Sequence, residues 1–392
     1  MGKARTVLLI IALLSLNIVE QAASAISATI PAMAESFPNK SLVQIELTTT
    51  IVSMFVTIFV LVSGFLTKKY GQKTIAVIGL AIASIASIIP MFVNNFNVIL
   101  ISRAILGIGI GLANPLAISL IGEFFTGKTL ANLMGWRSAI AGVGVSAMTF
   151  LAGQFLRYNW HLSYAVYLLF VPTLILFIFF VPSPEKYGLK KEDEIIEDNQ
   201  VKHSKLPVIA LALILLLYFP CIMMLTLKLA TFFVENHIGS AVDASTILSI
   251  SGIAQLLGGA CFGLFYRFLK ENLFPLSILI TGICVIGVAM LSSLTSITIL
   301  VIIFSFCGGL AIPYIFVKVS DYSSTKEAPL NNGICLVGSN MGSFLTPYVG
   351  TFFGSTAQDS IFNSGIAIII LAIAIFVLSV LMRKRIKTVK GI

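Results

Sequence analysis

Twelve long apolar stretches fill this chain of 392 residues, and they constrain its fold more than any other feature. A bilayer core of about 30 Å takes roughly 20 apolar residues as a helix, and only helices or closed barrels satisfy their backbone groups in lipid. The stretches are too long and too uniformly apolar for the alternating strands of a barrel. We therefore predict an all-α membrane protein with twelve spans, at Thr6–Ile30, Ile45–Thr67, Thr74–Val93, Val98–Ile121, Leu133–Phe155, Leu162–Val181, Leu206–Val234, Ala244–Tyr266, Phe274–Ser293, Thr298–Ser320, Gly333–Phe353 and Ile361–Met382.

The basic residues between these spans predict the orientation of the chain. If the N-terminus is inside, nineteen lysines and arginines lie in cytoplasmic ends and loops, and only Lys40 and Arg157 lie on the opposite side. Such an excess follows the positive-inside rule, so we expect both termini in the cytoplasm and the protein in a bacterial type of cytoplasmic membrane. The four remaining basic residues fall within predicted spans: Arg103, Arg137, Lys228 and Lys318.

A polar segment at residues 183–205 divides the chain. It is rich in acidic and lysine residues and has no apolar periodicity, which predicts a cytoplasmic linker between two six-helix halves, residues 1–182 and 206–392. A faint repeat relates the halves, because a Gly-Phe-Leu-Thr-Lys sequence from Gly64 corresponds to Gly-Leu-Phe-Tyr-Arg from Gly263. A parallel repeat of this size is typical of transporters with a site between two bundles.

Three short motifs carry a resemblance to a known family. The basic turn Gly64-Phe-Leu-Thr-Lys-Lys-Tyr-Gly-Gln-Lys73 resembles the loop motif of the major facilitator superfamily, and the segment Arg103–Gly111 resembles its arginine-glycine motif. Asn159 and Trp160 open the sixth span as in that family. The resemblance, closest to the twelve-helix drug/proton antiporters, implies two bundles that rock around a central cavity, driven by a proton gradient.

The loop motif supplies the candidate gating residues Gly64, Lys68 and Gly71. The resemblance implies an aspartate at position 68 that braces the cytoplasmic gate against the start of the eleventh helix. A helix N-terminus carries partial positive charge, so a lysine there would weaken the closed gate. The alternative is that Lys68 is only one more lysine of the positive-inside pattern. The chain also departs from the family at Leu106, where a glutamine is usual, and lacks a Gly-Pro pair near Met148.

Glu20 is the candidate proton-coupling residue, because by these boundaries it is the only carboxylate deep within a span. Desolvation favours the neutral form of a carboxyl and so brings its proton affinity into a useful range. A polar stripe on one helix face surrounds it and predicts a face toward the cavity: Asn17, Glu20, Gln21, Ser24 and Ser27. The alternative is a structural pair between Glu20 and an arginine.

The basic residues in the spans each have two interpretations. The resemblance implies that Arg103 lies beside the first helix, where it either tunes Glu20 or serves packing. Lys228 shares a stripe with Tyr218 and Thr231 and either lines the cavity or extends toward the interface. Lys318 either lines the cavity or pairs with Asp321 one turn away.

These features together predict a secondary transporter, most simply a proton-coupled exporter of small amphipathic or drug-like molecules. The alternative is an organic-anion transporter, suggested by the basic residues in spans. A channel or an intramembrane enzyme would need a repeated filter or a catalytic constellation, and the sequence contains neither. We expect a monomer that needs no cofactor or metal, with a small-molecule substrate, protons and membrane lipids as partners. The net charge of +9 lies in the loops and indicates lipid attraction rather than nucleic-acid binding.

Overall fold

The computed structural model describes residues 3–20, 22–184, 206–323 and 327–390, and the described chain is entirely helical. The predicted linker at 183–205 lies almost wholly outside these residues. The first half contains α1 (Lys3–Glu20), η1 (Ala22–Ser24), η2 (Ser27–Thr29), α2 (Ile30–Ser36), α3 (Leu42–Tyr70), α4 (Gln72–Phe92), α5 (Phe96–Phe124), α6 (Gly127–Leu156), α7 (Trp160–Ser163), η3 (Tyr164–Leu169) and α8 (Phe170–Phe180). The second half contains α9 (Leu206–Glu235), α10 (Ala241–Leu269), η5 (Lys270–Asn272), α11 (Leu273–Met290), α12 (Leu294–Asp321), α13 (Ala328–Phe353) and α14 (Ala357–Lys390).

These helices confirm the predicted membrane fold. Nine described segments are long and apolar enough to cross a membrane, or ten if the bent pair α1 and α2 forms one span. One of the nine, Ala241–Met290, contains both α10 and α11 and so covers two predicted spans. The helix α13 covers the predicted eleventh span. The protein is therefore a multi-pass, all-α membrane protein with twelve membrane-spanning segments.

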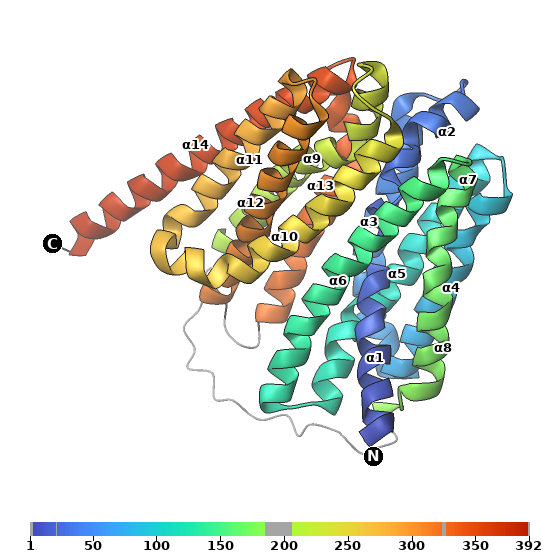
Figure 1. The fold of residues 1–392 in the computed structure, drawn as a ribbon. Coiled ribbons are helices and arrows are strands. Elements are labelled where there is room, and N and C mark those ends of the chain that lie inside the picture. The colour runs from blue at the N-terminus through green and yellow to red at the C-terminus, as the bar shows by residue number, and fades with distance from the viewer. Residues whose placement is uncertain (1–2, 21, 185–205, 324–326, 391–392) are drawn as a thin grey trace.

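The two halves of the chain form separate hydrophobic cores that lie side by side (Figure 1). One core consists of buried residues between Leu9 and Val181, and the other of buried residues between Val208 and Ala372. Only Leu227 and Ala28 belong to the core of the other half among the described buried residues. Few apolar side chains therefore tie the two bundles together.

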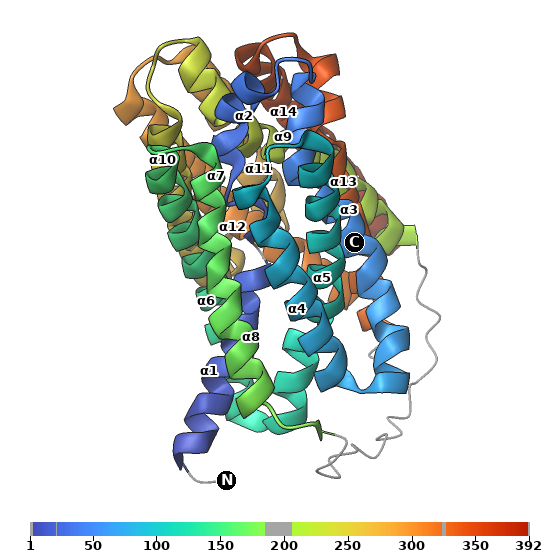
Figure 2. The ribbon, with the colours of Figure 1, turned by 90° about the vertical axis from the view of Figure 1, so that its right-hand side faces the viewer.

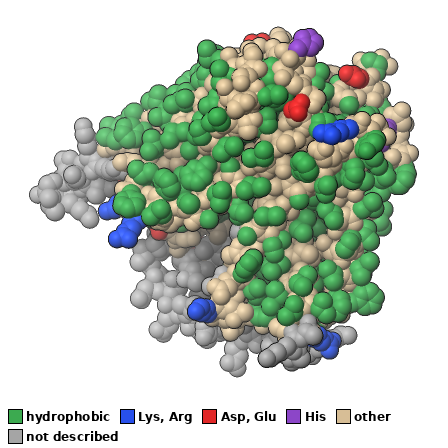
Figure 3. Space-filling model, in the orientation of Figure 1, with side chains coloured by type: hydrophobic (Ala, Val, Ile, Leu, Met, Phe, Trp, Pro, Cys, Tyr) green, Lys and Arg blue, Asp and Glu red, His purple; other side chains and the backbone are tan. Residues whose placement is uncertain are grey.

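Hydrophobic side chains cover the flank of the molecule, while charged side chains gather toward its two ends (Figure 3). The end where α1 begins carries the turn between α3 and α4 and is here named the basic face. The end with α2 and the loop between α4 and α5 is named the closed face, because the helices of the two halves converge there (Figures 1 and 2).

The first predicted span is broken, which corrects the expectation of one continuous helix over Thr6–Ile30. α1 ends at Glu20, two short 3-10 segments follow, and the axis bends by 47° before the end of α2. The sixth span is interrupted as well, because the 3-10 segment η3 separates α7 from α8. Pro172 explains the second break, since its ring clashes with the carbonyl four residues earlier. At the end of the first break, Pro31 in the first turn of α2 acts in the same way on the Ser27 carbonyl. Neither proline nor glycine lies near the earlier segment η1, so other parts of the chain must stabilise the break there.

The bundles meet most closely where α6 crosses α10 near the closed face. The Ser245 hydroxyl donates a hydrogen bond to the Thr149 carbonyl oxygen at 2.6 Å, and the Ser249 hydroxyl donates to the Ser146 carbonyl oxygen at 2.7 Å. A Cβ atom on Gly153 would approach Ser245 Cβ to 2.5 Å. Small side chains on both helices therefore permit this close approach, as in other membrane helix pairs.

We predict that Gly153→Ala opens the closed face. The added methyl group clashes with Ser245 only while α6 and α10 are in contact, and such overpacking costs about 1–3 kcal/mol. Spin-label distances between exposed residues Asn94 and Ser292 on that face should lengthen. Gly135→Ala on the same helix is the control, because a Cβ atom there meets no neighbour within 4 Å. Equal distances in both variants would contradict the prediction.

Candidate functional site

Arg103 on α5 stabilises the break in the first span. Its side chain is completely buried and donates three hydrogen bonds: from Nε to the Thr48 carbonyl at 2.8 Å, from one terminal nitrogen to the Tyr167 hydroxyl at 3.0 Å, and from the other to the Ala23 carbonyl at 2.7 Å. Tyr167 in turn donates to the Ala22 carbonyl at 3.0 Å. The backbone oxygens freed by the break therefore find partners on two other helices.

This geometry supports the packing interpretation of Arg103 that the sequence left open. The guanidinium also lies 5.3 Å from the Tyr167 ring centroid and 5.9 Å from that of Tyr164. A buried arginine is tolerated when its donors are used, and here neutral oxygens use three of them. The Glu20 side chain and all of Gln21 lie outside the described residues, so the predicted contact of Arg103 with Glu20 stays a prediction.

A buried ion pair joins the two bundles. Lys228 Nζ on α9 lies 2.8 Å from Glu46 Oε1 on α3, and the two side chains are 7% and 0% exposed. Glu46 lies near the end of its span, as the predicted boundary at Ile45 implies, but its complete burial and its pairing with Lys228 were not predicted. Glu46 lies only one turn inside α3, but η1 and α2 pack against α3 and Lys228 reaches the carboxylate from α9. The position of Glu46 near the end of the helix therefore did not reveal that it is buried.

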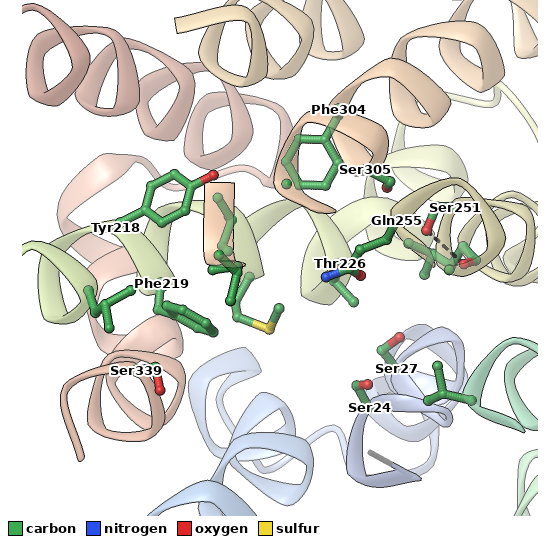
Figure 4. Close-up of a pocket in the computed structure, with 18 of the residues that line it drawn as sticks. Ser24, Ser27, Tyr218, Phe219, Thr226, Ser251, Gln255, Phe304, Ser305 and Ser339 are labelled. Atoms are coloured by element: carbon green, nitrogen blue, oxygen red, sulfur yellow. Dashed lines mark hydrogen bonds between the residues drawn. The ribbon is translucent and has the colours of Figure 1, made fainter. Parts of the chain in front are cut away.

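A cavity of about 420 Å³ lies between the bundles (Figure 4). The first half contributes Ser24 and Ser27 from the broken span and Val145 and Thr149 from α6. The second half contributes Leu215, Tyr218, Phe219, Ile222, Met223, Thr226, Leu248, Ser251, Gly252, Gln255, Phe304, Ser305, Gly308, Ile312, Phe316, Leu336, Ser339 and Asn340. None of these described lining residues carries a formal charge. The walls therefore offer apolar surface together with hydroxyl and amide groups.

The predicted polar stripe of the first span divides between cavity and core. Ser24 and Ser27 line the cavity, and the buried Ser27 hydroxyl has no hydrogen-bond partner in the described structure. Asn17 is completely buried, does not line the cavity, and donates its amide to the carbonyls of Leu13 and Leu14 on its own helix. The break changes the helical phase, which explains why residues before and after it do not share a face.

The two lysines predicted within spans both contact carboxylates. Lys318 near the end of α12 lies 3.3 Å from Asp321 and 5.8 Å from the Tyr314 ring centroid, as the pairing alternative predicted. Neither Lys318 nor Lys228 is among the residues that line the cavity. In this conformation the positive charges of the spans are thus kept away from the cavity wall.

The predicted gating residues all lie at the basic face. Gly71 ends α3 with a positive φ of 82°, which favours glycine and produces the sharp turn into α4. Lys68 is exposed in the last turn of α3, and a Cβ atom on Gly64 would meet no neighbour within 4 Å. The exposure of Lys68 leaves both its interpretations open.

Most residues that line the cavity were not predicted from the sequence, because only charged residues stand out within apolar spans. A signal was present in α10, where Ser251, Gly252 and Gln255 recur at spacings of one and three residues within an apolar span. In lipid such a polar stripe faces protein or water. Gln255 is exposed toward the cavity and lies opposite Ser24 and Ser27 (Figure 4).

Comparison with known proteins agrees with this architecture. Residues 11–317 match the profile of the Major Facilitator Superfamily. Among solved structures, a D-xylose-proton symporter superposes with a TM-score of 0.74 at 14% identity, covering 94% of this chain and 96% of that one. A peptide transporter, POT, superposes with a TM-score of 0.76 at 11% identity, covering 94% of each chain. At such low identity these likenesses show the fold alone.

Curated relatives match over shorter segments. The multidrug transporter protein MdtP of Bacillus subtilis is 37% identical over 87 residues, which is 22% of this chain and 16% of that protein. The arabinose-proton symporter of the same organism is 24% identical over 135 residues, 32% of this chain and 28% of that protein. The niacin transporter NiaP of Acinetobacter baylyi is 24% identical over 156 residues, 38% and 35% of the two chains. The chain thus matches well under half the length of each of these relatives.

The chain belongs to the Major Facilitator Superfamily, since the family profile covers most of its length. It is therefore a secondary transporter of the membrane and not an enzyme.

We predict that Tyr167→Phe destabilises the protein more than Tyr164→Phe. Both tyrosines are completely buried next to Arg103, but the Tyr167 hydroxyl binds Arg103 and Ala22, whereas the Tyr164 hydroxyl only faces the Met33 sulfur at 3.7 Å. Leaving a buried donor and a buried acceptor unpaired costs about 1–3 kcal/mol. Thermal unfolding in detergent measures the difference, and equal melting temperatures would argue against the stabilising role of Arg103 and Tyr167.

We predict that Lys68→Asp favours closure of the basic face. The family resemblance implies that position 68 meets the start of α13 when the basic face is closed. Exchanging an ammonium for a carboxylate there is worth about 1–2 kcal/mol, or roughly a five- to thirtyfold change in a two-state ratio. Spin labels at the exposed residues Thr129 and Lys270 should then come closer together. Lys69→Asp makes the same charge change one residue away and should do less. Unchanged distances in Lys68→Asp would leave Lys68 as a topology signal.

Proposed function

We propose that this transporter exports small, uncharged or weakly amphipathic molecules in exchange for protons. The observation that carries this proposal is the composition of the cavity, whose described lining combines aromatic and aliphatic side chains with serine, threonine and amide groups and no formal charge. Sites of this kind suit ligands with apolar surface and a few hydrogen-bonding groups.

Specific polar groups are available to a ligand in the cavity. The unpartnered hydroxyl of Ser27 offers one donor and acceptor, and the side chain of Gln255 extends from the opposite wall. Phe219 and Phe304 supply flat apolar surface nearby (Figure 4). A molecule with an aromatic or aliphatic body and one or two neutral polar groups would use both kinds of contact.

The direction and the driving force follow from observations outside the cavity. The similarity to the multidrug transporter MdtP favours export, although it covers only 22% of the chain. If the basic face is cytoplasmic, as the positive-inside rule predicts, the conformation described here is closed on the outer side. A proton gradient would then drive the change of access, with Glu20 at the end of α1 as the coupling residue that the sequence predicts.

The organic-anion alternative has less support from the site. It depended on lysines within the spans, but Lys228 and Lys318 are bound to Glu46 and Asp321 and do not line the cavity. An anion entering the described cavity would lose its hydration without meeting a cation, which is unfavourable. We therefore rank neutral substrates first.

Reconstitution in liposomes under an imposed pH gradient tests the proposed function. The substrate panel should contain neutral amphipathic compounds, organic anions and organic cations of similar size. We expect gradient-driven transport of neutral compounds and little of the others. Transport limited to anions would replace the proposal with the organic-anion alternative, and transport unaffected by the pH gradient would remove proton coupling from it.

The variant Glu20→Gln tests the predicted coupling residue. It keeps the shape of the side chain and removes its titration, so gradient-driven transport should fall at least about tenfold while substrate binding partly survives. Asn17→Ala on the same helix is the control, because Asn17 is buried away from the cavity. Full proton-driven transport by Glu20→Gln would exclude Glu20 as the coupling residue.

A further inference from the structure

The ion pair between Glu46 and Lys228 lies between the cavity and the closed face. Thr226, two residues before Lys228 on α9, lines the cavity, and Glu46 lies in the second turn of α3 from the closed face. The Lys228 stem packs near Gly350 of α13, where an added Cβ atom would meet Lys228 Cε at 3.1 Å. Residues of α3, α9 and α13 therefore meet at this pair, and a movement that separates α3 from α9 breaks it.

Several buried polar atoms around the pair have no partner in the described structure. The second carboxylate oxygen, Glu46 Oε2, accepts no hydrogen bond. The hydroxyl groups of Thr49 and Thr50, one turn along α3, and of Thr231, one turn along α9, are also unpartnered. A proton on Oε2 would need an acceptor, and a threonine one helical turn away is placed on the same face to provide it. A proton bound at Glu46 Oε2 would therefore have a hydroxyl group nearby to accept its hydrogen bond.

The energetics of a buried pair depend on both charges being present. Each ion has lost its hydration, and the remaining partner is strongly unfavourable when the other is neutralised. Proton binding to Glu46 would leave the Lys228 ammonium buried without its counter-ion. Water reaches both groups once the closed face opens, so protonation favours the open arrangement.

We propose that Glu46 is a proton-binding site whose protonation releases Lys228 and opens the closed face. The exchange is balanced: the carboxylate of Glu46 gains one proton from the solution at the closed face, the ion pair dissociates, and Lys228 keeps its charge. This inference rests on the proposed proton coupling and adds a second proton-binding residue beside Glu20.

Two other charged groups lie near the ion pair, Glu235 and Arg103. Glu235, near the end of α9, acts on Glu46 with like charge and is the other acid that faces it. Arg103 of α5 binds the Thr48 carbonyl two residues from Glu46, and its donors are engaged there, at Ala23 and at Tyr167. Lys228 is therefore the cation that responds directly to the protonation of Glu46.

Spin-label distances between Asn94 and Ser292 across the closed face, measured from pH 8 to pH 5 without substrate, test the inference. The five native cysteines are replaced by alanine before labelling. In the otherwise unchanged protein, the ratio of open to closed distances should rise about tenfold as the pH falls. In Glu46→Gln the ratio should already be about tenfold higher at pH 8 and should change less than about twofold with pH.

Two further variants keep the test decisive. Glu46→Asp retains a carboxylate and should retain the pH response, which a purely steric role of the side chain would not explain. Glu235→Gln removes the neighbouring acid and should also retain the pH response.

The inference is overturned if the unchanged protein shows no pH response, if Glu46→Gln keeps the full response, or if Glu235→Gln abolishes the response. Should Glu46→Gln fail to fold, the charge-exchanged pair Glu46→Lys with Lys228→Glu should restore the closed state at pH 8, and a failure to do so would also count against it.

The outcome is separable from that of the proposed function. A pH-dependent closed face in a protein whose transport ignores the pH gradient would refute proton coupling but leave the proton site at Glu46. Proton-driven transport together with an unaltered pH response in Glu46→Gln would refute the site and leave the function.

Discussion

The contact on which the rest of the structure depends is that of Arg103 with the break in the first span. A continuous helix would use the carbonyls of Ala22 and Ala23 for its own hydrogen bonds, and Arg103 would then be buried with unused donors. Because the helix is broken, these oxygens accept from Arg103 and Tyr167 instead. The break and the buried arginine therefore stabilise each other. The break also places Ser24 and Ser27 in the cavity wall.

Contacts within a half differ in kind from contacts between the halves. Within the halves, backbones cross so closely that a Cβ atom on Gly109 would meet the Ala83 amide nitrogen at 2.5 Å, and one on Gly107 would meet the Val52 carbonyl at 2.6 Å. Between the halves, the close glycine contacts are with serine side chains rather than backbone atoms, as at Gly153. The described hydrogen bonds and ion pairs there are two serine hydroxyls on backbone carbonyls and one ion pair. Such contacts can separate and re-form, whereas the glycine crossings resist any change. We therefore expect each bundle to move as a unit.

The sequence predicted the membrane class and the helices well, because the length of apolar segments is dictated by the bilayer itself. It also identified Arg103 and the sharp turn at Gly71 from their motifs. It failed at Glu46 and at the break near Glu20, since both depend on which helices face each other. No local pattern reveals that α9 covers Glu46 or that Arg103 reaches Ala23. The neutral cavity residues were missed for a related reason, because serine and glutamine on a span become informative only once the facing helices are known.

Charged and neutral side chains are separated in space: the cavity wall is neutral, and the buried ion pair lies between the cavity and the closed face. The charged pair of Glu46 and Lys228 is buried between two bundles that must separate, where its dissociation has a large effect on conformation. The described cavity wall carries only neutral groups, so a neutral substrate meets little electrostatic barrier there. A charged group inside the cavity would couple substrate binding and bundle movement through the same side chain. In the proposed mechanism, Lys228 lies two residues beyond Thr226, so the proton and the substrate act on different residues. Substrate range can then vary while the control of access is preserved.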